Sequence, residues 1–271
     1  MKFRFLFTFL LTTPFFVESF GSVQLLKKSI PIVKKHAEKY NVDESHNHIH
    51  SLEVANYCLC LIRFETNLSK MEKDIAILGS IFHDTIDDKY IPSSENTEEL
   101  LQSYLEQVVG KNSKLIEPVI LFSKSMSYSK TVIRQKDKSL ILQIPSYIQT
   151  HPYVRAFHLM RNADLLSSYN LKRCLLFRSW RNETKDSVLL YDEMQELYWD
   201  RMHLLRKYNI LSLENPYCDL ASKLLEASTE RRIKNYENYI TDSKNEPLCF
   251  EDLINYFEVT LVKEDNGFLL Y

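Results

Sequence analysis

The sequence predicts an all-α protein, and two observations lead to that prediction. The 271 residues include only 4 glycines, although hairpins and parallel-sheet folds commonly need glycine at their turns. From Val23 onward, apolar residues recur almost without a break at the three- and four-residue spacing of amphipathic helices. A chain of this length can bury a real hydrophobic core without disulfide staples. We therefore expect a helical bundle with a C-terminal helical extension.

Individual helices follow from the periodicity and from capping residues. A first apolar stripe begins at Leu25 and ends near Tyr40, and Asp43 or Ser45 can cap the helix that follows. Polar stretches at 84–96 and 125–146 indicate loops, the second with a short helix of its own. The helices expected after the first cover residues 46–66, 71–83, 97–109, 115–125, 152–168, 171–180, 185–208, 215–240 and 251–262.

The first 21 residues are typical of a signal peptide. Lys2 and Arg4 precede an uncharged apolar run over residues 5–17, which is shorter than the ~18–20 residues that cross a bilayer. Ser19 and Gly21 suit a cleavage site, and the segment resembles the signal part of plastid presequences in algae with secondary plastids. We expect no stable transmembrane span, and entry into the secretory pathway or an organelle such as a plastid. Two alternatives stay open, a membrane-tethering or buried N-terminal helix and, if the segment is not processed, a cytoplasmic protein.

The amino-acid composition limits which partners the rest of the chain is expected to bind. The formal net charge of −2 argues against non-specific nucleic-acid binding, which usually requires a basic excess. The five cysteines are widely spaced and odd in number, so we interpret them as small buried hydrophobic residues. No repeat or clear boundary interrupts the chain. We therefore divide it into a targeting segment (1–21), one helical domain (22–240) and a C-terminal helix and tail (241–271).

Three histidines lie within five residues at the expected start of the second helix. His46 and His50 are four residues apart and share a helix face, and the stripe of His50 continues through Val54 and Cys58. That stripe is apolar, so His50 should point inward. A single inward histidine is more often a satisfied core residue than a metal ligand, so this feature alone decides nothing.

Two further acidic positions change that balance. His83 and Asp84 follow each other at the end of an apolar helix, where a buried carboxylate is costly unless a cation compensates it. A divalent metal would do so, with imidazole and carboxylate as ligands, and Gly79 one turn earlier leaves room for another helix. Asp164 lies inside a helical pattern between apolar residues, where an ion pair with Arg161 is the simplest interpretation.

Taken together, these motifs resemble the HD superfamily. Its pattern is a histidine, a His-Asp pair about thirty residues later and a later Ala-Asp-Leu, which here are His50, His83–Asp84 and Asp164. The closer resemblance, over residues 25–240, is to the bacterial metal-dependent phosphohydrolases of that superfamily. It includes the stretches Asp43-Glu-Ser-His-Asn-His-Ile-His50 and Ser127-Tyr-Ser-Lys130. One segment departs, because Asn162-Ala-Asp-Leu-Leu-Ser167 stands where that family usually has Asp-Ala-Asp-Arg-Leu-Asp.

The resemblance implies an HD-domain helical bundle with one divalent metal (Mn, Mg, Fe or Co). It further implies hydrolysis of a small phosphorylated substrate, a nucleotide-like phosphomonoester or phosphodiester, by a water that the metal activates. The ligands would be His50, His83, Asp84 and Asp164. Asp84 would also orient the water, His46 would donate a proton to the leaving group, and Lys89 would assist catalysis. The substrate phosphate would contact Lys89 first, followed by Arg161 and Lys130.

Two other functions stay open. The acidic residues that the family has on either side of Asp164 are absent here. Their absence is compatible with a degenerate HD domain that binds a nucleotide or a protein partner without turnover. Aromatic residues of the C-terminal helices would then serve that partner, although such residues more often indicate core or homodimer packing. An HD-fold di-iron oxygenase needs additional histidines. His158 lies six residues before Asp164, so the two should point to different sides of one helix, and His151 precedes a helix start.

Overall fold

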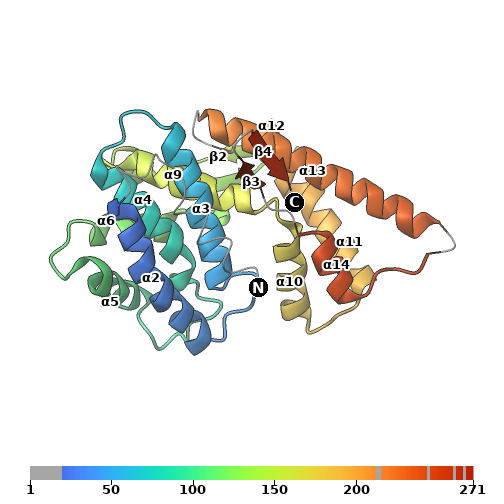
Figure 1. Ribbon diagram of the computed structural model, residues 1–271, viewed down its shortest axis with the longest axis horizontal. Coiled ribbons are helices and arrows are strands. Elements are labelled where there is room, and N and C mark those ends of the chain that lie inside the picture. The colour runs from blue at the N-terminus through green and yellow to red at the C-terminus, as the bar shows by residue number, and fades with distance from the viewer. Residues whose placement is uncertain (1–19, 212–214, 243–244, 259–260, 265–266, 271) are drawn as a thin grey trace.

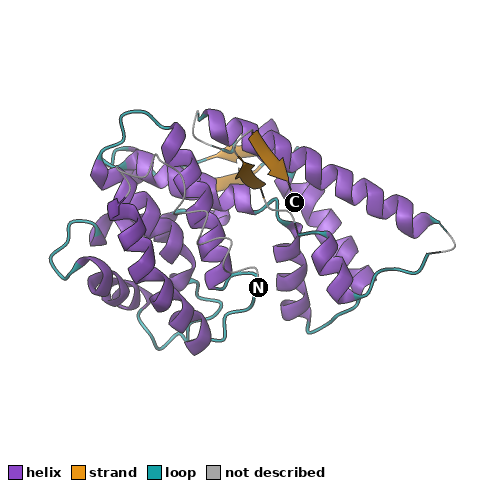
Figure 2. Cartoon of the chain, in the orientation of Figure 1, coloured by secondary structure: helices purple, strands orange, loops and turns teal. Residues whose placement is uncertain are grey.

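Helices make up nearly all of the regular structure, which confirms the all-α prediction (Figure 2). The computed structural model describes residues 20–211, 215–242, 245–258, 261–264 and 267–270. Its longer helices are α2 (Phe20–Lys39), α3 (His48–Phe64), α4 (Lys70–Phe82), α5 (Thr97–Val109), α6 (Ile116–Ser125), α9 (Val154–Ser167), α10 (Leu171–Asn182), α11 (Ser187–Leu197) and α13 (Pro216–Thr241). Its shorter elements are α7 (Tyr128–Thr131), α8 (Ser146–Gln149), α12 (Leu204–Lys207), α14 (Phe250–Tyr256), the 3-10 turn η2 (His83–Ile86) and the π-helical turn η3 (Tyr198–Met202).

Short polar side chains set several helix starts. The Ser69 hydroxyl and the Glu72 carboxylate cap α4 reciprocally, in a capping box. Asn47 caps α3 by accepting a hydrogen bond from the Ile49 amide, and Asn215 caps α13 in the same way. The expected start of the second helix at His46 was therefore wrong by two residues, because Asn47 takes the cap position and leaves His46 in the preceding turn.

Three other segments differ from the expectation. The single helix expected over residues 185–208 is interrupted by the π-helical turn η3, after which α12 resumes. The helix expected over 251–262 ends at Tyr256, and Leu261–Glu264 forms strand β3, which pairs antiparallel with β4 (Gly267–Leu270). Residues 125–146 contain the expected short helix but also a hairpin of β1 (Val132–Arg134) and β2 (Leu140–Leu142). Both hairpins use apolar, partly β-branched runs, which favour strands.

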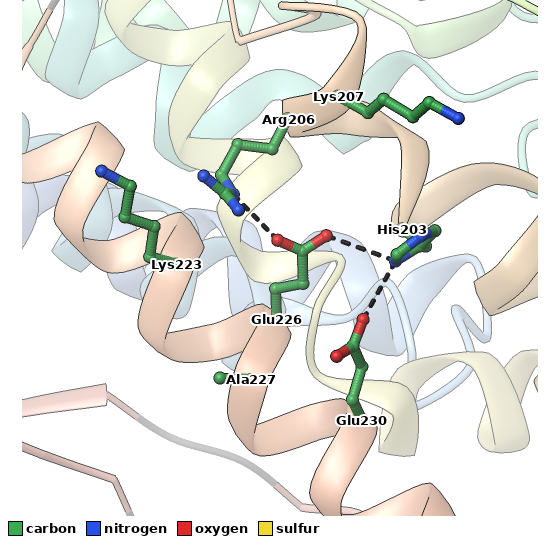
Figure 3. A pocket seen from close by; sticks show the side chains of 7 residues that line it. All are labelled: His203, Arg206, Lys207, Lys223, Glu226, Ala227 and Glu230. Atoms are coloured by element: carbon green, nitrogen blue, oxygen red, sulfur yellow. Dashed lines mark hydrogen bonds and ion pairs between the residues drawn. The ribbon is translucent and has the colours of Figure 1, made fainter.

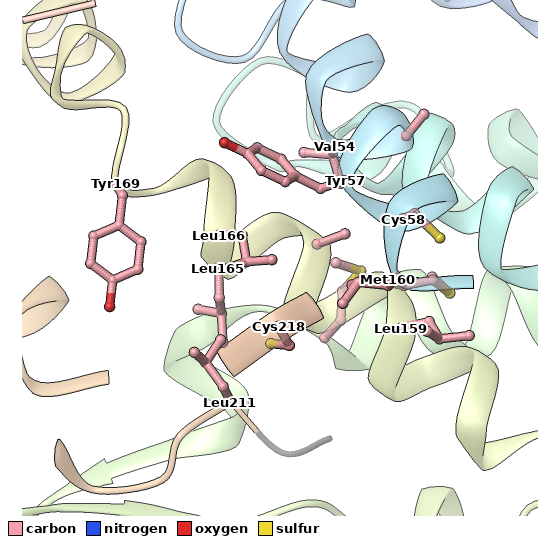
Figure 4. Close-up of a cluster of buried hydrophobic side chains, with 14 of the residues drawn as sticks. Val54, Tyr57, Cys58, Leu159, Met160, Leu165, Leu166, Tyr169, Leu211 and Cys218 are labelled. Atoms are coloured by element: carbon pink, nitrogen blue, oxygen red, sulfur yellow. The ribbon is translucent and has the colours of Figure 1, made fainter. Parts of the chain in front are cut away.

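The centre of the bundle is built by α3, α4 and α9, which pack against one another, with α2 on α4 and with α5 and α6 alongside (Figure 1). Figure 4 shows part of the core, where Val54 and Cys58 of α3 lie near Leu159 and Met160 of α9. Cys218 of α13 reaches the same cluster. Helix α13 also packs on α3 and α9, and so ties the C-terminal helices to the bundle.

Gly79 explains how closely α4 and α9 approach. A Cβ atom at this position would lie 2.1 Å from Cε and 2.4 Å from Sδ of Met160, a fully buried side chain. The room expected at Gly79 is therefore filled by α9. Gly79 lies one helical turn before His83, and Met160 lies one turn before Asp164, so this contact sets how far apart those two side chains are.

The C-terminal helices lie on one side of this bundle. Helix α10 packs against α11 and α14, and the long α13 runs beside them (Figure 1). Within the part of the chain that the structure describes, no helix is long and apolar enough to cross a membrane. The expected signal peptide lies outside the described residues, except that its last two positions, Phe20 and Gly21, begin α2.

Candidate metal centre

Three elements bring the predicted ligands together. His50 lies in the first turn of α3 and Asp164 in the last turns of α9. His83 and Asp84 lie where α4 tightens into the 3-10 turn η2, which the Thr85 hydroxyl stabilises by donating to the Phe82 carbonyl. Adjacent residues of a regular α-helix point about 100° apart. His83 and Asp84 nevertheless face the same point, since Oδ1 of Asp84 lies 3.2 Å from Nε2 of His83.

The side chains converge closely. Nε2 of His50 lies 3.3 Å from Nε2 of His83 and 3.5 Å from Oδ1 of Asp164. Nε2 of His83 lies 3.7 Å from the same Asp164 oxygen. One donor atom from each of these three residues lies within 4.8 Å of the others. The group could therefore hold a metal ion.

Asp84 contacts both histidines, through different oxygens. Its Oδ1 lies 3.2 Å from Nε2 of His83 and its Oδ2 lies 3.4 Å from Nε2 of His50. The histidine side chains are 1% and 5% exposed, whereas those of Asp84 and Asp164 are 18% and 25% exposed. The centre is therefore closed on the imidazole side and accessible on the carboxylate side.

The outer nitrogens of the two histidines both face oxygen acceptors, but only that of His83 makes a hydrogen bond to one. Nδ1 of His83 donates to the Ser80 carbonyl over 2.9 Å, so in the neutral ring the lone pair of Nε2 faces the centre. Nδ1 of His50 lies 3.9 Å from Oε2 of Glu53, and Glu53 is held by the side-chain amide of Asn170. Carbonyl or carboxylate partners of this kind are typical of metal-ligating histidines.

The two carboxylates at the centre favour the binding of positive charge. Burial alone would lower the pKa of His83, but Asp84 and Asp164 raise it to about 9. Burial would raise the pKa of Asp84, but His83 and His50 hold it well below its usual value. The buried Oδ2 of Asp84 nevertheless has no hydrogen-bond partner among the described residues. Such a carboxylate oxygen is costly unless a cation binds it, so the residues present fit a divalent metal.

His46 and Lys89 lie at the edge of the centre, on a common aromatic ring. The ring centroids of His46 and His50 are 6.2 Å apart, and that of His46 is 5.4 Å from Phe177. Nδ1 of His46 lies 3.2 Å from the Tyr90 hydroxyl. Nζ of Lys89 lies 5.3 Å from the centre of the Phe177 ring and pairs with Asp87 over 3.0 Å, while its side chain remains 50% exposed.

Arg161 and Lys130 are engaged elsewhere in the fold. Arg161 is 1% exposed, and its guanidinium donates to the Thr131 hydroxyl and the Ile210 carbonyl over 3.0 and 2.6 Å. Nζ of Lys130 donates to the Lys124 carbonyl over 2.7 Å. These two cations connect segments of the chain to each other, and none of these hydrogen bonds is to a residue of the metal centre.

Two arginines near the centre were not identified from the sequence. Nη1 of Arg173, on α10, lies 3.9 Å from Oδ1 of Asp164. The guanidinium of Arg201, on η3, lies 3.6 Å from the centre of the Tyr128 ring. No local pattern distinguishes either residue from the other arginines of the C-terminal half. Only the packing of α10 and η3 beside α9 gives them their positions.

The histidines that an oxygenase would recruit lie elsewhere. Nδ1 of His151 accepts a hydrogen bond from the Tyr153 amide, and its ring packs on Phe122. Burial, together with the charge of Arg161, lowers the pKa of His158 to about 4. Among the described residues, neither histidine belongs to a group of three or more potential metal ligands.

A second group of potential ligands lines a pocket of about 410 Å³ on α12 and α13 (Figure 3). Nδ1 of His203 lies 3.0 Å from Oε1 of Glu230 and 3.4 Å from Oε1 of Glu226. The other Glu226 oxygen accepts a hydrogen bond from Arg206 over 2.8 Å, and Lys223 lines the same pocket. Arg206 offsets the charge of Glu226, whereas Lys223 pairs with Asp219 over 2.6 Å. A metal is therefore needed less at this group than at the buried centre.

Comparisons of this chain with protein-family models, curated proteins and solved structures gave no match. Its function is therefore argued from the geometry and chemistry of the centre.

Proposed function

We propose that this protein binds one divalent metal ion through His50, His83, Asp84 and Asp164 and hydrolyses a phosphoric ester, as the HD phosphohydrolases that its motifs resemble do. One observation carries the proposal. Two inward imidazole nitrogens and two carboxylates from separate elements converge within contact distance, and a buried Asp84 oxygen among them lacks a hydrogen-bond donor.

A metal fits this group better than a proton does. A proton on His83 offsets one negative charge, whereas Asp84 and Asp164 together carry two, and Arg173 approaches only Asp164, at 3.9 Å. The group around His203 differs, since Arg206 already neutralises Glu226 there. We therefore assign the metal to the buried centre, where nitrogen and carboxylate donors suit Mn²⁺, Fe²⁺, Co²⁺ or Mg²⁺.

The surrounding residues position water, substrate and protons. A bound divalent cation would lower the pKa of a coordinated water and stabilise charge on phosphoryl oxygens. The Ser80 carbonyl orients the His83 imidazole, and the partial exposure of Asp84 and Asp164 leaves the approach for substrate on their side. Asp84 would ligate the metal through the oxygen that lacks a donor, and its other oxygen could accept a hydrogen bond from the attacking water.

His46 is the proton donor in this proposal. The hydroxyls of Ser45 and Tyr90 both donate to Asp43, so their oxygens act as acceptors for Nδ1–H of His46. Nδ1 therefore keeps its proton, and Nε2 is the nitrogen that exchanges one with the leaving group. Lys89, beside the same Phe177 ring, supplies positive charge at this edge.

The proposal is tested by metal content and turnover together. Elemental analysis of purified protein should give one equivalent of metal, retained by His203→Ala and lost by His83→Ala and Asp84→Ala. A panel of phosphorylated metabolites with Mn²⁺ should then give turnover that both of the latter variants abolish. Full turnover in either variant, or no stoichiometric metal in the wild type, would contradict the proposal. Two irons would favour the oxygenase, and metal without turnover the degenerate domain.

A further inference from the structure

We propose that Arg201 and Arg173 form an anion subsite beside the metal centre, which binds the oxygens of a terminal phosphate group. The substrate class, a phosphomonoester, rests on the proposed function. The binding of a phosphate anion by the two arginines does not, because it needs only their guanidinium groups.

Arg201 is a mostly buried cation without a counterion. Its guanidinium stacks on the Tyr128 ring at 3.6 Å, a contact that leaves the N–H groups in its plane available. No hydrogen bond or ion pair joins it to any other described residue, although burial lowers its pKa. Because none of its nitrogens is among the buried atoms that lack a partner, its donors face solvent. Stacking on a ring is a common way of presenting such donors to phosphate.

The backbone at Arg201 is unusual in the same place. Residues Tyr198–Met202 form a π-helical turn, which interrupts what the sequence predicts as one continuous helix. Inserting a residue into a helix in this way shifts the direction of the side chains, and such turns occur frequently at functional sites. The turn places Arg201 where its charge interacts with both Asp164 and Arg173.

Arg173, on α10, is held in place by two hydrogen bonds. Its Nε donates to the Ser45 carbonyl over 2.9 Å and its Nη1 to the Ser167 hydroxyl over 2.8 Å, while Nη1 lies 3.9 Å from Asp164. Arg173 and Arg201 thus place two like charges near one carboxylate, and these two charges repel each other. An anion between them relieves that repulsion.

The charge of the subsite indicates which anion it takes. Two guanidinium groups beside a divalent metal favour a dianion with several oxygens at tetrahedral angles, because each guanidinium can donate two parallel hydrogen bonds. A terminal phosphate of a monoester meets this requirement. The bridging phosphate of a diester carries one charge and only two non-bridging oxygens, so the subsite favours the monoester of the two ester classes proposed.

Calorimetric titration of the full-length chain with inorganic phosphate, with and without chelator, tests the subsite. We expect Arg201→Gln to weaken phosphate binding by about tenfold to hundredfold in both conditions, and Arg201→Lys to restore part of it. The matched control is Arg181→Gln, an exposed arginine at the end of α10, which should bind as the wild type does. Arg173→Gln should reproduce the loss, and serves in its place if the Arg201 variants do not fold.

The outcomes separate the two proposals. If phosphate binding depends on Arg201 but no metal binds and no ester is hydrolysed, the subsite stands and the proposed function fails. If metal binding and hydrolysis are present but Arg201→Gln binds phosphate as tightly as Arg181→Gln does, the subsite is wrong and the proposed function stands. Absence of phosphate binding to the wild type would also overturn the subsite.

Discussion

Gly79→Ala should destabilise the protein and weaken metal binding together. The added Cβ would lie 2.1 Å from Cε of Met160, whereas ordinary contact begins at 3.4 Å, so the two must separate by about 1.3 Å. Met160 is fully buried and cannot turn out into solvent. Overpacking of this kind costs about 1–3 kcal/mol, against a gain of about 1 kcal/mol for replacing glycine within a helix. We expect a net loss of up to about 2 kcal/mol in the free energy of unfolding.

The same displacement should reach the metal centre. Gly79 and Met160 lie one turn before His83 and Asp164, so moving α9 away from α4 lengthens the distance between those two donors. Metal affinity should fall by at least tenfold, since misplacing a ligand by even half an ångström disrupts coordination.

A double-mutant cycle separates packing from helix propensity. A Met160→Ala background removes the three atoms that would lie nearest to the added methyl group, so Gly79→Ala should become neutral or stabilising in urea unfolding monitored by circular dichroism. If Gly79→Ala costs the same free energy in both backgrounds, Gly79 and Met160 do not interact and the packing described for α4 and α9 is wrong.

Three further predictions concern protons and capping. Burial would lower the pKa of His83, but Asp84 and Asp164 raise it to about 9. Metal binding at pH 7 should therefore release close to one proton, and the metal affinity should rise about tenfold per pH unit up to pH 9. Calorimetry in buffers of different ionisation enthalpy measures the released proton, and no proton release would contradict the prediction. Burial and nearby Lys39 lower the pKa of His36 from 6.5 to about 4, so the unfolded chain takes up the proton more readily. The free energy of unfolding should be highest above pH 6.5 and fall by about 1–2 kcal/mol towards pH 4.5. In His36→Gln, the free energy of unfolding measured in urea should depend less on pH. Asn215→Ala removes the α13 cap and the hydrogen bonds to Leu61 and Glu65, and should cost about 2–3 kcal/mol in urea unfolding, against about 1 kcal/mol for the exposed α5 cap, Asn96→Ala.

Most helices could be predicted because their signals are local. The apolar stripe predicts residues 97–109, which are the bounds of α5, and the helix expected from residue 215 begins one residue later, at Pro216. The π-helical turn at 198–202 was missed because the apolar residues there keep the spacing of a continuous α-helix. The strands β1 and β2 were missed because both are only three residues long and each needs the other to form.

Part of the centre was expected from the motifs taken together and from the resemblance that they carry, since each residue alone could be a core or ion-pair residue. His50, His83 and Asp164 were expected to meet, and one donor atom of each lies within 4.8 Å of the others. The Ser80 carbonyl that orients His83, and the two arginines on α10 and η3, could not be found from sequence. Their roles depend on which helices lie side by side in the fold.

Diffraction from crystals grown with Co²⁺, with data collected at the cobalt absorption edge, tests the central claim most directly. The proposal predicts one anomalous peak, about 2.0–2.2 Å from Nε2 of His50 and His83 and from carboxylate oxygens of Asp84 and Asp164. No peak between these four side chains, or a peak only beside His203, Glu226 and Glu230, would contradict it.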